Sequence, residues 1–493
     1  MNTTATAPAP QSHPGIAILG VPFDNVATEE AIALVERMVA SRRPHYFVTA
    51  NVDFLTQART DVELRRILLE AHLVLCDGTP LVWASRWLGN PLPQRVAGSD
   101  LVPLLIKLAA EKNLRLFFLG GTPESMDRAI ANLKAEHPQL AVAGYSPPFN
   151  QLLEMDHEEI KRRIAEARPD LLFVSFGCPK QEKWIAMHYQ SLGVPVAAGV
   201  GGTIDFLAGQ LKRAPLWMQR TGTEWLFRLC QEPRRLYRRY FRDLRVFAGA
   251  ILAQWWRMQF RGFKSKPGHV QTPLKSGSTA DWRWVELPER LDLAAVQHEA
   301  QLSGLVPDDD RHCLLPMKHV EFIDSTGVGW LIRLQKQFHA RDRQLILLNP
   351  HPAVKRALSL MRLDEYFVCA EDLAIARKLI KSRTLEQHEL VRERPGRSPG
   401  SLGWRGEITA VNAEPVWQQT ELRLAANGAA ERQWVIDLSD VRFMDSTGVG
   451  VMVRARNFAQ REGLQLNFTG AQPAVRNVLR LARLEASLLG DAA

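Results

Sequence analysis

The chain has 493 residues, of which 46% are hydrophobic and 23% are charged, a composition typical of folded globular proteins. This length exceeds what one hydrophobic core normally serves, so about three domains are expected. The net charge is +9. No apolar run reaches the 18 residues of a membrane-spanning helix, and the five cysteines lack the spacing of a zinc site or a disulfide framework. These features argue against a helical membrane protein and a disulfide scaffold, and favour a reducing cytoplasm.

The N-terminal part begins with MNTTATAPAPQSHPG (1–15), which lacks the charged start and apolar core of a secretory signal and is predicted to be a disordered lead. From 16 to 208, short apolar runs such as HYFVTAN, LVLCDG, LRLFFLGG, DLLFVSFG and VPVAAGVGG alternate with amphipathic stretches. This alternation is typical of a parallel sheet covered by helices on both faces.

Ligands of such sheets bind at the carboxyl ends of the strands. In this chain those ends carry small and polar residues, which predicts a polar binding site there. The residues are Thr49 and Asn51, Asp77 and Gly78, Gly120 and Gly121, Gly177, and the run from Gly199 to Gly202.

A basic segment follows at 209–265 and makes the whole protein basic. Between Gln210 and Lys266 there are 14 Lys or Arg residues against three acidic residues. The Arg residues are mixed with Trp, Tyr, Phe and Leu, which predicts a cationic amphipathic helix in the headgroup layer of an anionic membrane. We therefore expect a peripheral protein on the inner face of the cell membrane, with no nucleic-acid partner.

The C-terminal half contains a repeat. FIDSTGVGWLIR at 322–333 returns as FMDSTGVGVMVR at 443–454, with eight of twelve positions identical. We predict two domains, 283–383 and 403–493, each with a helical lead-in, an apolar strand, the DSTGVG passage, a helix, a second strand and a last helix. Loop-rich linkers are expected at 266–282 and 384–402.

At DSTG the repeats resemble the STAS domain of anti-sigma factor antagonists and sulfate-transporter tails. The resemblance implies that a partner kinase phosphorylates Ser446 and Ser325, with a change of docking. The alternative is that both serines only cap the following helix. The first copy is expected to be the degenerate one, because Pro316 stands where the second copy has Asp437.

Six motifs of the N-terminal half, in order, resemble the WecG/TagA/CpsF glycosyltransferases. They are VTANVDFL, LCDGTPLVW, RVAGSDL, FFLGGTPE, FGCPKQEKWI and GVGGTIDFLAG. The resemblance implies an inverting enzyme that moves a sugar from a UDP donor to a polyprenyl-diphosphate-linked acceptor without a metal or other cofactor. It places the catalytic base at Asp77, Thr49 and Asn51 in the same pocket, and Arg95 and Gln181 facing the substrates.

The diphosphate charge then has to be met by backbone N–H groups and by cationic side chains. The candidates are Gly120, Gly121, Gly199, Gly201, Gly202 and Arg95, with Arg234, Arg235, Arg238 and Arg239 of the basic segment. Asp53, Asp100 and Asp205 compete as carboxylates, with helix capping as their alternative; Asp205 is also counted with the substrate-binding residues. Gln181 has the alternative of a solvated loop residue.

The predicted fold class is α/β: a Rossmann-like parallel-sheet glycosyltransferase domain with a basic helical appendage, followed by two small α/β STAS-like domains. The predicted function is transfer of N-acetylmannosamine, its uronic acid or glucose in bacterial exopolysaccharide or cell-surface glycan synthesis. The tandem domains are expected to regulate or dock, outside the catalytic machinery. The competing hypothesis is a non-enzymatic partner-switching regulator with an inactive transferase-like domain.

Overall fold

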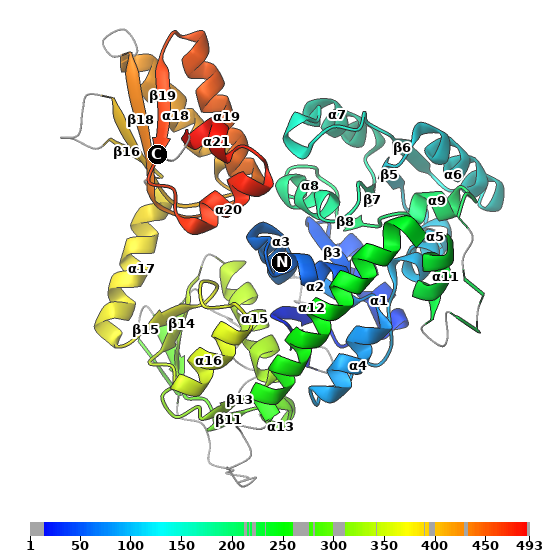
Figure 1. The fold of residues 1–493 in the computed structure, drawn as a ribbon, viewed down its shortest axis with the longest axis horizontal. Coiled ribbons are helices and arrows are strands. Elements are labelled where there is room, and N and C mark those ends of the chain that lie inside the picture. The colour runs from blue at the N-terminus through cyan, green and yellow to red at the C-terminus, as the bar shows by residue number, and fades with distance from the viewer. Residues whose placement is uncertain are drawn as a thin grey trace, which may run out of the picture.

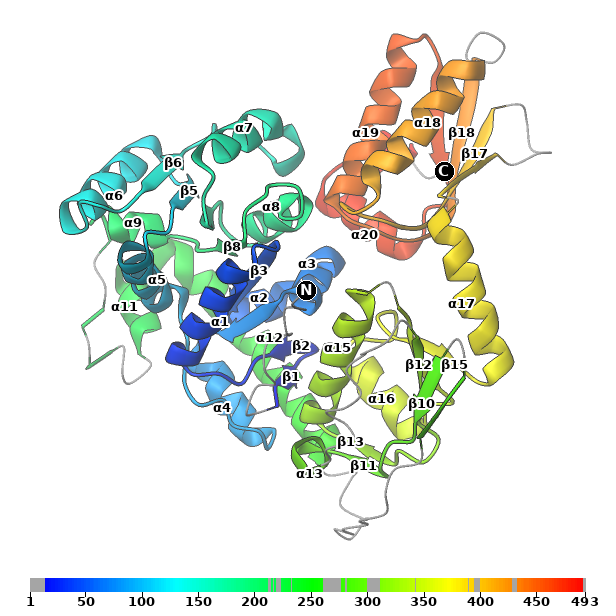
Figure 2. The same cartoon turned by 180° about the vertical axis from the view of Figure 1, so that it is seen from behind.

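The computed structural model describes residues 14–211, 214–215, 217–218, 223–231, 233–259, 276–279, 282–298, 311–341, 343–388, 390–393, 400–427 and 432–490. Residues 1–13 of the predicted lead and 266–275 of the first predicted linker lie outside this part. Three α/β units follow one another along the chain, as Figures 1 and 2 show from opposite sides. We call them the N-terminal domain (14–211), the first repeat domain (276–370) and the second repeat domain (390–490); the helical appendage (214–259) follows the N-terminal domain.

The N-terminal domain is built on a six-stranded parallel sheet in the order β4-β3-β8-β7-β5-β6. Its strands are β3 (His45–Ala50), β4 (Leu73–Cys76), β5 (Leu116–Gly120), β6 (Val142–Tyr145), β7 (Leu171–Ser175) and β8 (Val196–Gly199). Alternating residues enter two cores: Tyr46 and Val48 pack on one face, and Phe47 on the other. A parallel sheet buried on both faces explains the continuous apolar runs in the sequence.

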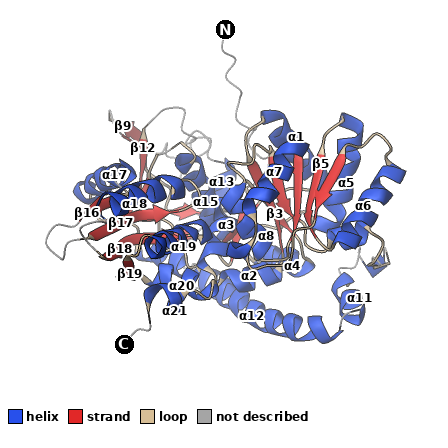
Figure 3. Cartoon of the chain, turned by 90° about the horizontal axis from the view of Figure 1, so that it is seen from above, coloured by secondary structure: helices blue, strands red, loops and turns tan. Residues whose placement is uncertain are grey.

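Helices cover both faces of this sheet (Figure 3). They are α1 (Thr28–Ser41), α2 (Val52–Ala58), α3 (Val62–Glu70), α4 (Thr79–Trp87), α5 (Gly98–Lys112), α6 (Pro123–Glu136), α7 (His157–Ala167), α8 (Lys180–His188) and α9 (Thr203–Leu207), with a 3₁₀ turn at Leu152–Glu154. An antiparallel hairpin, β1 (Ile16–Ile18) and β2 (Val21–Phe23), precedes the sheet. The predicted α/β fold of this domain is confirmed.

The helical appendage consists of α11 (Glu224–Gln231) and α12 (Pro233–Gln259). The long helix α12 runs along the N-terminal domain against α2 (Figures 1 and 3). Phe247, Ile251 and Met258 on one of its faces are buried, whereas Tyr237 and Phe241 are exposed. The basic helix is therefore amphipathic, as expected, but its inner face packs on protein.

The first repeat domain has the sheet order β15-β14-β12-β10-β9. Its strands are β9 (Ser276–Ser278), β10 (Trp282–Val285), β12 (His312–Pro316), β14 (Leu345–Leu348) and β15 (Val368–Ala370), with a separate pair β11 (Arg290–Leu291) and β13 (Phe322–Ile323). The helices are α13 (Leu293–His298), α15 (Ser325–His339) and α16 (Pro352–Leu360). Strands open the domain, and the expected helical lead-in, α13, follows them and precedes β12.

The second repeat domain has the sheet order β16-β17-β18-β19. Its elements are β16 (Val391–Glu393), β17 (Ser401–Ile408), α18 (Ala413–Asn427), β18 (Gln433–Met444), α19 (Ser446–Arg461), β19 (Gln465–Thr469), α20 (Pro473–Leu481) and α21 (Glu485–Leu489). The strand β18 runs unbroken to the DSTG passage, whereas the matching strand of the first copy stops at Pro316. A proline lacks the N–H that a continuing ladder needs.

A helix, α17 (Leu373–His388), joins the two repeat domains. It packs against β14 and β15 of the first sheet and against β17 of the second. It therefore occupies the first five positions of the predicted linker 384–402, and β16 occupies three more.

Candidate active site

The carboxyl ends of the central strands lie side by side. Ala50 of β3 is opposite Cys76 of β4, and Gly120 of β5 is opposite Ser175 of β7. Val174 of β7 is opposite Gly199 of β8. The residues that follow these strands therefore meet at one edge of the sheet, where the sequence placed the site.

Asp77 is the first residue after β4 and is partly exposed. Its backbone N–H donates to the carbonyl of Ala50 at 2.9 Å, which holds it beside the end of β3. The next residue, Gly78, is the N-cap of α4. Asp77 thus lies on a fixed backbone with its side chain within reach of solvent, a suitable place for a general base.

Thr49 and Asn51 flank the end of β3. Thr49 is buried against α5, where a Cβ added to Gly98 would lie 3.0 Å from the Thr49 hydroxyl oxygen. The Oδ1 atom of Asn51 accepts from the backbone N–H groups of Asp53 at 3.0 Å and Phe54 at 3.4 Å. Asn51 is therefore the N-cap of α2, in addition to its predicted place near the substrates.

Arg95 is held by two carboxylates. Its Nη1 bonds to Glu224 of α11 at 2.7 Å and its Nη2 to Asp100 of α5 at 2.8 Å. Burial lowers the pKa of Arg95, but the hydrogen bond to Glu224 and the charges of Asp77 and Asp100 outweigh it and raise the pKa. Arg95 thus lies near the proposed base and joins the sheet edge to the appendage, a link with no signal in the sequence.

Gln181 lies beneath two glycine loops. It is 3% exposed, so the interpretation of Gln181 as a solvated loop residue is wrong. Its Oε1 accepts from the backbone N–H of Gly177 at 3.1 Å and of Gly201 at 3.2 Å. Gln181 therefore fixes the loops after β7 and β8.

Two expected anion-binding N–H groups have protein partners. The N–H of Gly201 binds Gln181, and the N–H of Gly121 donates to the carbonyl of Ser175 at 3.2 Å. Gly120 has a φ of +105°, and a Cβ there would lie 2.5 Å from the same carbonyl oxygen, so its lack of a side chain serves close packing. Gly199 and Gly202 lie at the same edge. Because the N–H groups of Gly121 and Gly201 already have partners in the protein, cationic side chains are the better candidates for binding a diphosphate.

Glu182 was not among the residues predicted from the sequence. It is buried, and its Oε1 accepts from Gln181 Nε2 at 2.7 Å. Burial raises the pKa of Glu182 to about 7, against the opposing effect of the Gln181 hydrogen bond. Its position next to Gln181 in the CPKQEKW motif could have indicated from the sequence that Glu182 belongs to the site.

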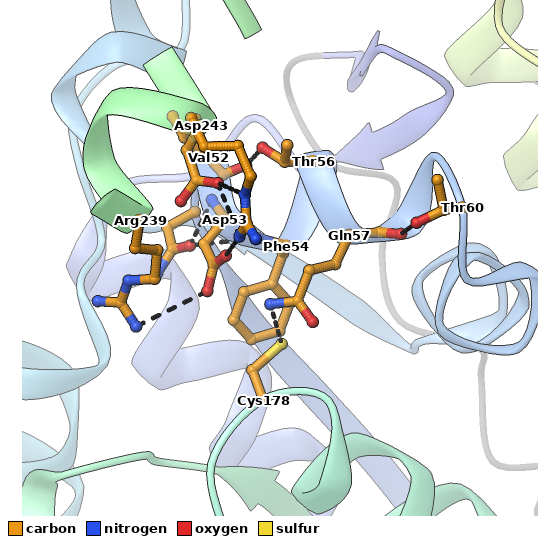
Figure 4. Close-up of polar contacts among 11 residues, drawn as sticks. Val52, Asp53, Phe54, Thr56, Gln57, Thr60, Cys178, Arg239 and Asp243 are labelled. Carbon is orange, nitrogen blue, oxygen red and sulfur yellow. Dashed lines mark hydrogen bonds and ion pairs between the residues drawn. The ribbon is translucent and has the colours of Figure 1, made fainter. Parts of the chain in front are cut away.

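Asp53 is on α2 and faces the appendage. Its carboxylate is 3.9 Å from Arg239 and 3.8 Å from Arg242, and Arg242 also lies 3.2 Å from Asp243 (Figure 4). Burial and the charge of Asp53 raise the pKa of Asp243. On the same helix α2, Gln57 Nε2 lies 3.8 Å from Cys178 Sγ, in the loop before α8. Arg239 was predicted near the site by number, and Arg242 is another arginine of the same basic segment.

The remaining arginines of the appendage differ in position. Arg234 and Arg238 are exposed, and the side chain of Arg235 lies outside the described residues. Asp53, Asp100 and Asp205 stand in the first turns of α2, α5 and α9, whose N-caps are Asn51, Ala97 and Gly202. Helix capping is therefore not the role of these three carboxylates.

The DSTG serines are buried, and their neighbouring aspartates are the caps. Asp324 Oδ1 accepts from the N–H groups of Thr326 and Gly327, and Asp445 Oδ1 from those of Thr447 and Gly448, at 2.7–3.0 Å. Ser325 and Ser446 are the first residues of α15 and α19. The interpretation of the serines as caps is therefore wrong.

Within the described ranges, no group of three or more His, Cys, Asp or Glu side chains is arranged to hold a metal ion. The helices of the same part of the chain include none that is both long and apolar enough to cross a bilayer.

Comparison with known protein families agrees with this geometry. Residues 16–261 match the Glycosyl transferase WecG/TagA/CpsF family, residues 283–376 match the STAS domain, and residues 394–490 match the family described as Mlab, STAS domain. The chain is thus a glycosyltransferase joined to two STAS domains, as both resemblances in the sequence implied.

The N-terminal part of the chain is also similar to individual enzymes. The N-acetylglucosaminyldiphosphoundecaprenol N-acetyl-beta-D-mannosaminyltransferases of Staphylococcus aureus strains MW2 and NCTC 8325 / PS 47 are each 31% identical over 223 residues. The match covers 45% of this chain and 86% of each relative. The chain belongs to the WecG/TagA/CpsF family.

Proposed function

We propose that this protein is an inverting, metal-independent glycosyltransferase that moves a sugar from a UDP donor to a polyprenyl-diphosphate-linked acceptor. The observation that carries the proposal is the position of Asp77, fixed beside the ends of β3 and β4 and within the electrostatic reach of Arg95. The similarity to enzymes named for a lipid-linked acceptor supports the substrate class. The product would enter bacterial exopolysaccharide or another cell-surface glycan.

In this reaction Asp77 takes the proton of the acceptor hydroxyl as its oxygen attacks the anomeric carbon of the donor. Attack comes from the face opposite to UDP, so the new glycosidic bond forms as the bond to the diphosphate oxygen breaks, and configuration inverts. UDP leaves with the bonding electron pair. Its negative charge is met by Arg95 and by Arg239 and Arg242 of α12.

The appendage also accounts for access to a lipid-linked acceptor. Its outer face exposes Arg234 and Arg238 together with Tyr237, Phe241 and Trp256. Basic residues near an anionic surface contribute about 1 kcal/mol each, and aromatic rings favour the headgroup layer. The enzyme would then act as a peripheral protein on the inner face of the membrane.

The competing function, a partner-switching regulator, requires a reachable DSTG serine. Both serines are buried against the rest of the chain, which favours the enzymatic proposal. The phosphorylation of Ser446 and Ser325 stays a prediction.

The test is acceptor-dependent release of UDP by the purified full-length protein. UDP-linked N-acetylmannosamine, its uronic acid and glucose would each be supplied with and without polyprenyl-diphosphate N-acetylglucosamine. We expect one donor to give UDP only when the lipid is present. The proposal is contradicted if no donor gives acceptor-dependent release while the protein remains folded.

A further inference from the structure

Each repeat domain meets the rest of the chain through its DSTG helix start. In Figures 1 and 2, α15 of the first repeat domain lies beside β1 and α12, and α19 and α20 of the second lie beside α8 and α3. Ser325 and Ser446, for which the sequence predicted a partner kinase, both lie in these contacts.

In the first contact, Ser325 faces α12. Its Oγ accepts from Gln254 Nε2 at 2.9 Å, and both residues are 1% exposed. The same Gln254 donates to the carbonyl of Ala17 at 3.0 Å and accepts from the N–H of Leu19 at 2.8 Å. One buried amide thus ties together α12, the β1 hairpin and the first repeat domain.

In the second contact, Ser446 faces Glu63 of α3. The Ser446 N–H and Oγ donate to the two oxygens of Glu63 at 2.6 and 2.8 Å. Glu63 is 2% exposed and Ser446 is 5% exposed. A second Glu63 partner is Lys183 of α8, whose Nζ lies 2.8 Å from Glu63 and 2.8 Å from Asp61.

Both contacts end on elements that carry the candidate active site. The helix α12 brings Arg239 and Arg242 to Asp53. On α8, Lys183 follows two positions after Gln181, which holds the loops after β7 and β8.

We propose that the two repeat domains are intramolecular positioning elements of the transferase, acting through Gln254–Ser325 on α12 and through Glu63–Ser446 on α8. The inference rests on the proposed function, and Glu63 and Gln254 are its positioning residues. A buried carboxylate needs its hydrogen-bond partners, so the arrangement of Lys183 depends on whether Ser446 is in place. The repeat domains then belong to the catalytic unit, contrary to the sequence-based expectation.

The experiment uses full-length protein and changes only the second contact. Ser446→Asp places a carboxylate against Glu63, and like-charge repulsion should separate the two surfaces. Ser487→Asp is the matched control, because Ser487 is an exposed residue of the same domain whose hydroxyl donates within that domain, to Leu484 O at 3.1 Å. Hydrogen exchange of α8 and the Kd of UDP are measured for each variant.

We expect Ser446→Asp to raise exchange across 177–188 and to weaken UDP binding about 2- to 30-fold, the range of coupling between distant sites. The donor KM should rise by the same factor with kcat little changed, and Ser487→Asp should match wild type. Adding Glu63→Gln to Ser446→Asp removes the like charge and should restore part of the UDP affinity. This recovery separates positioning from simple misfolding.

Two results would overturn the inference: faster α8 exchange with unchanged UDP affinity, or unchanged α8 exchange. They are distinct from failure of the proposed function, in which the wild type itself neither binds UDP nor releases it. Gln254→Ala tests the first contact in the same way, with exchange of α12 as the readout, and no change in that exchange contradicts a role for Gln254.

Discussion

The guanidinium of Arg95, in the loop between α4 and α5, is bonded to Glu224, the first residue of α11, at 2.7 Å. A residue expected to meet the substrate therefore also anchors the appendage. Because Asp100 holds the other nitrogen at 2.8 Å, the guanidinium is fixed before any diphosphate arrives. Preorganised cations of this kind stabilise a leaving diphosphate without the cost of reorganisation.

Arg95→Ala should lower kcat/KM for the donor about 10- to 100-fold, the value of a hydrogen bond to a charged group. Glu224→Gln keeps the Arg95 cation while weakening the link to α11, so it should cost much less. Steady-state kinetics of UDP release measures both. Equal losses in the two variants would show that Arg95 serves only to hold the appendage.

Asp77→Asn and Asp77→Ala should each lower turnover about 10²- to 10⁴-fold, the usual contribution of a positioned general base. Folding should be unaffected because the side chain is partly exposed. Asp127→Asn, an exposed carboxylate on α6, is the matched control. Near-normal turnover of either Asp77 variant would remove Asp77 from the mechanism.

Chelation should not change the rate. The proposed mechanism uses arginine side chains for the diphosphate, so UDP release in EDTA should equal that in buffer, with or without added Mg²⁺ or Mn²⁺. A large loss on chelation that a metal ion restores would point to metal catalysis.

Charge reversal on the two faces of α12 should have different effects. Arg234→Glu with Arg238→Glu changes the exposed face, so it should release the protein from anionic vesicles, and wild-type binding should weaken with salt. Arg239→Glu faces Asp53 and should instead lower activity with a water-soluble acceptor. Vesicle sedimentation and UDP release separate these outcomes; salt-insensitive binding would argue against an electrostatic membrane surface.

The second repeat domain should lose stability as pH rises. Burial, together with the charge of Glu63, raises the pKa of Asp445 to about 7 against its backbone hydrogen bonds. A carboxyl whose pKa is higher in the folded state binds more protons there, so its stabilising effect is present at low pH and disappears between about pH 4 and 7. Calorimetry should show the difference in unfolding free energy between wild type and Asp445→Asn falling from about pH 4 to 7; a constant difference contradicts the assignment.

The sequence predicted the parts of the fold that depend on local pattern. Five parallel strands follow from apolar runs such as DLLFVSFG, because a sheet buried on both faces needs continuous apolar residues. The short strands β1 and β6 carry too little pattern to be recognised, and β16 falls in a charged stretch. The break at Pro316 was readable because proline has a defined backbone chemistry.

Several residues of the candidate site were predictable from the sequence, but the contacts between them were not. The motifs identified Asp77, Arg95 and Gln181, yet nothing local shows that Gln181 is buried under glycine loops. The pair Glu63 and Ser446 is separated by 383 positions, and no periodicity or composition links them. Contacts between domains depend on surfaces that form only after each domain has folded.

The helix α17 sets both the distance and the relative orientation of the two repeat domains. Because it packs on both sheets, it sets the angle at which the second domain is presented to α3 and α8. Each residue of an α-helix adds about 100° of rotation and about 1.5 Å of rise. A single inserted residue would therefore turn Ser446 away from Glu63 without altering either side chain, whereas seven added residues, nearly two full turns, would restore the orientation at a greater reach. The number of residues in α17 therefore matters as much as the residues in contact, because it sets the rotation of the second repeat domain.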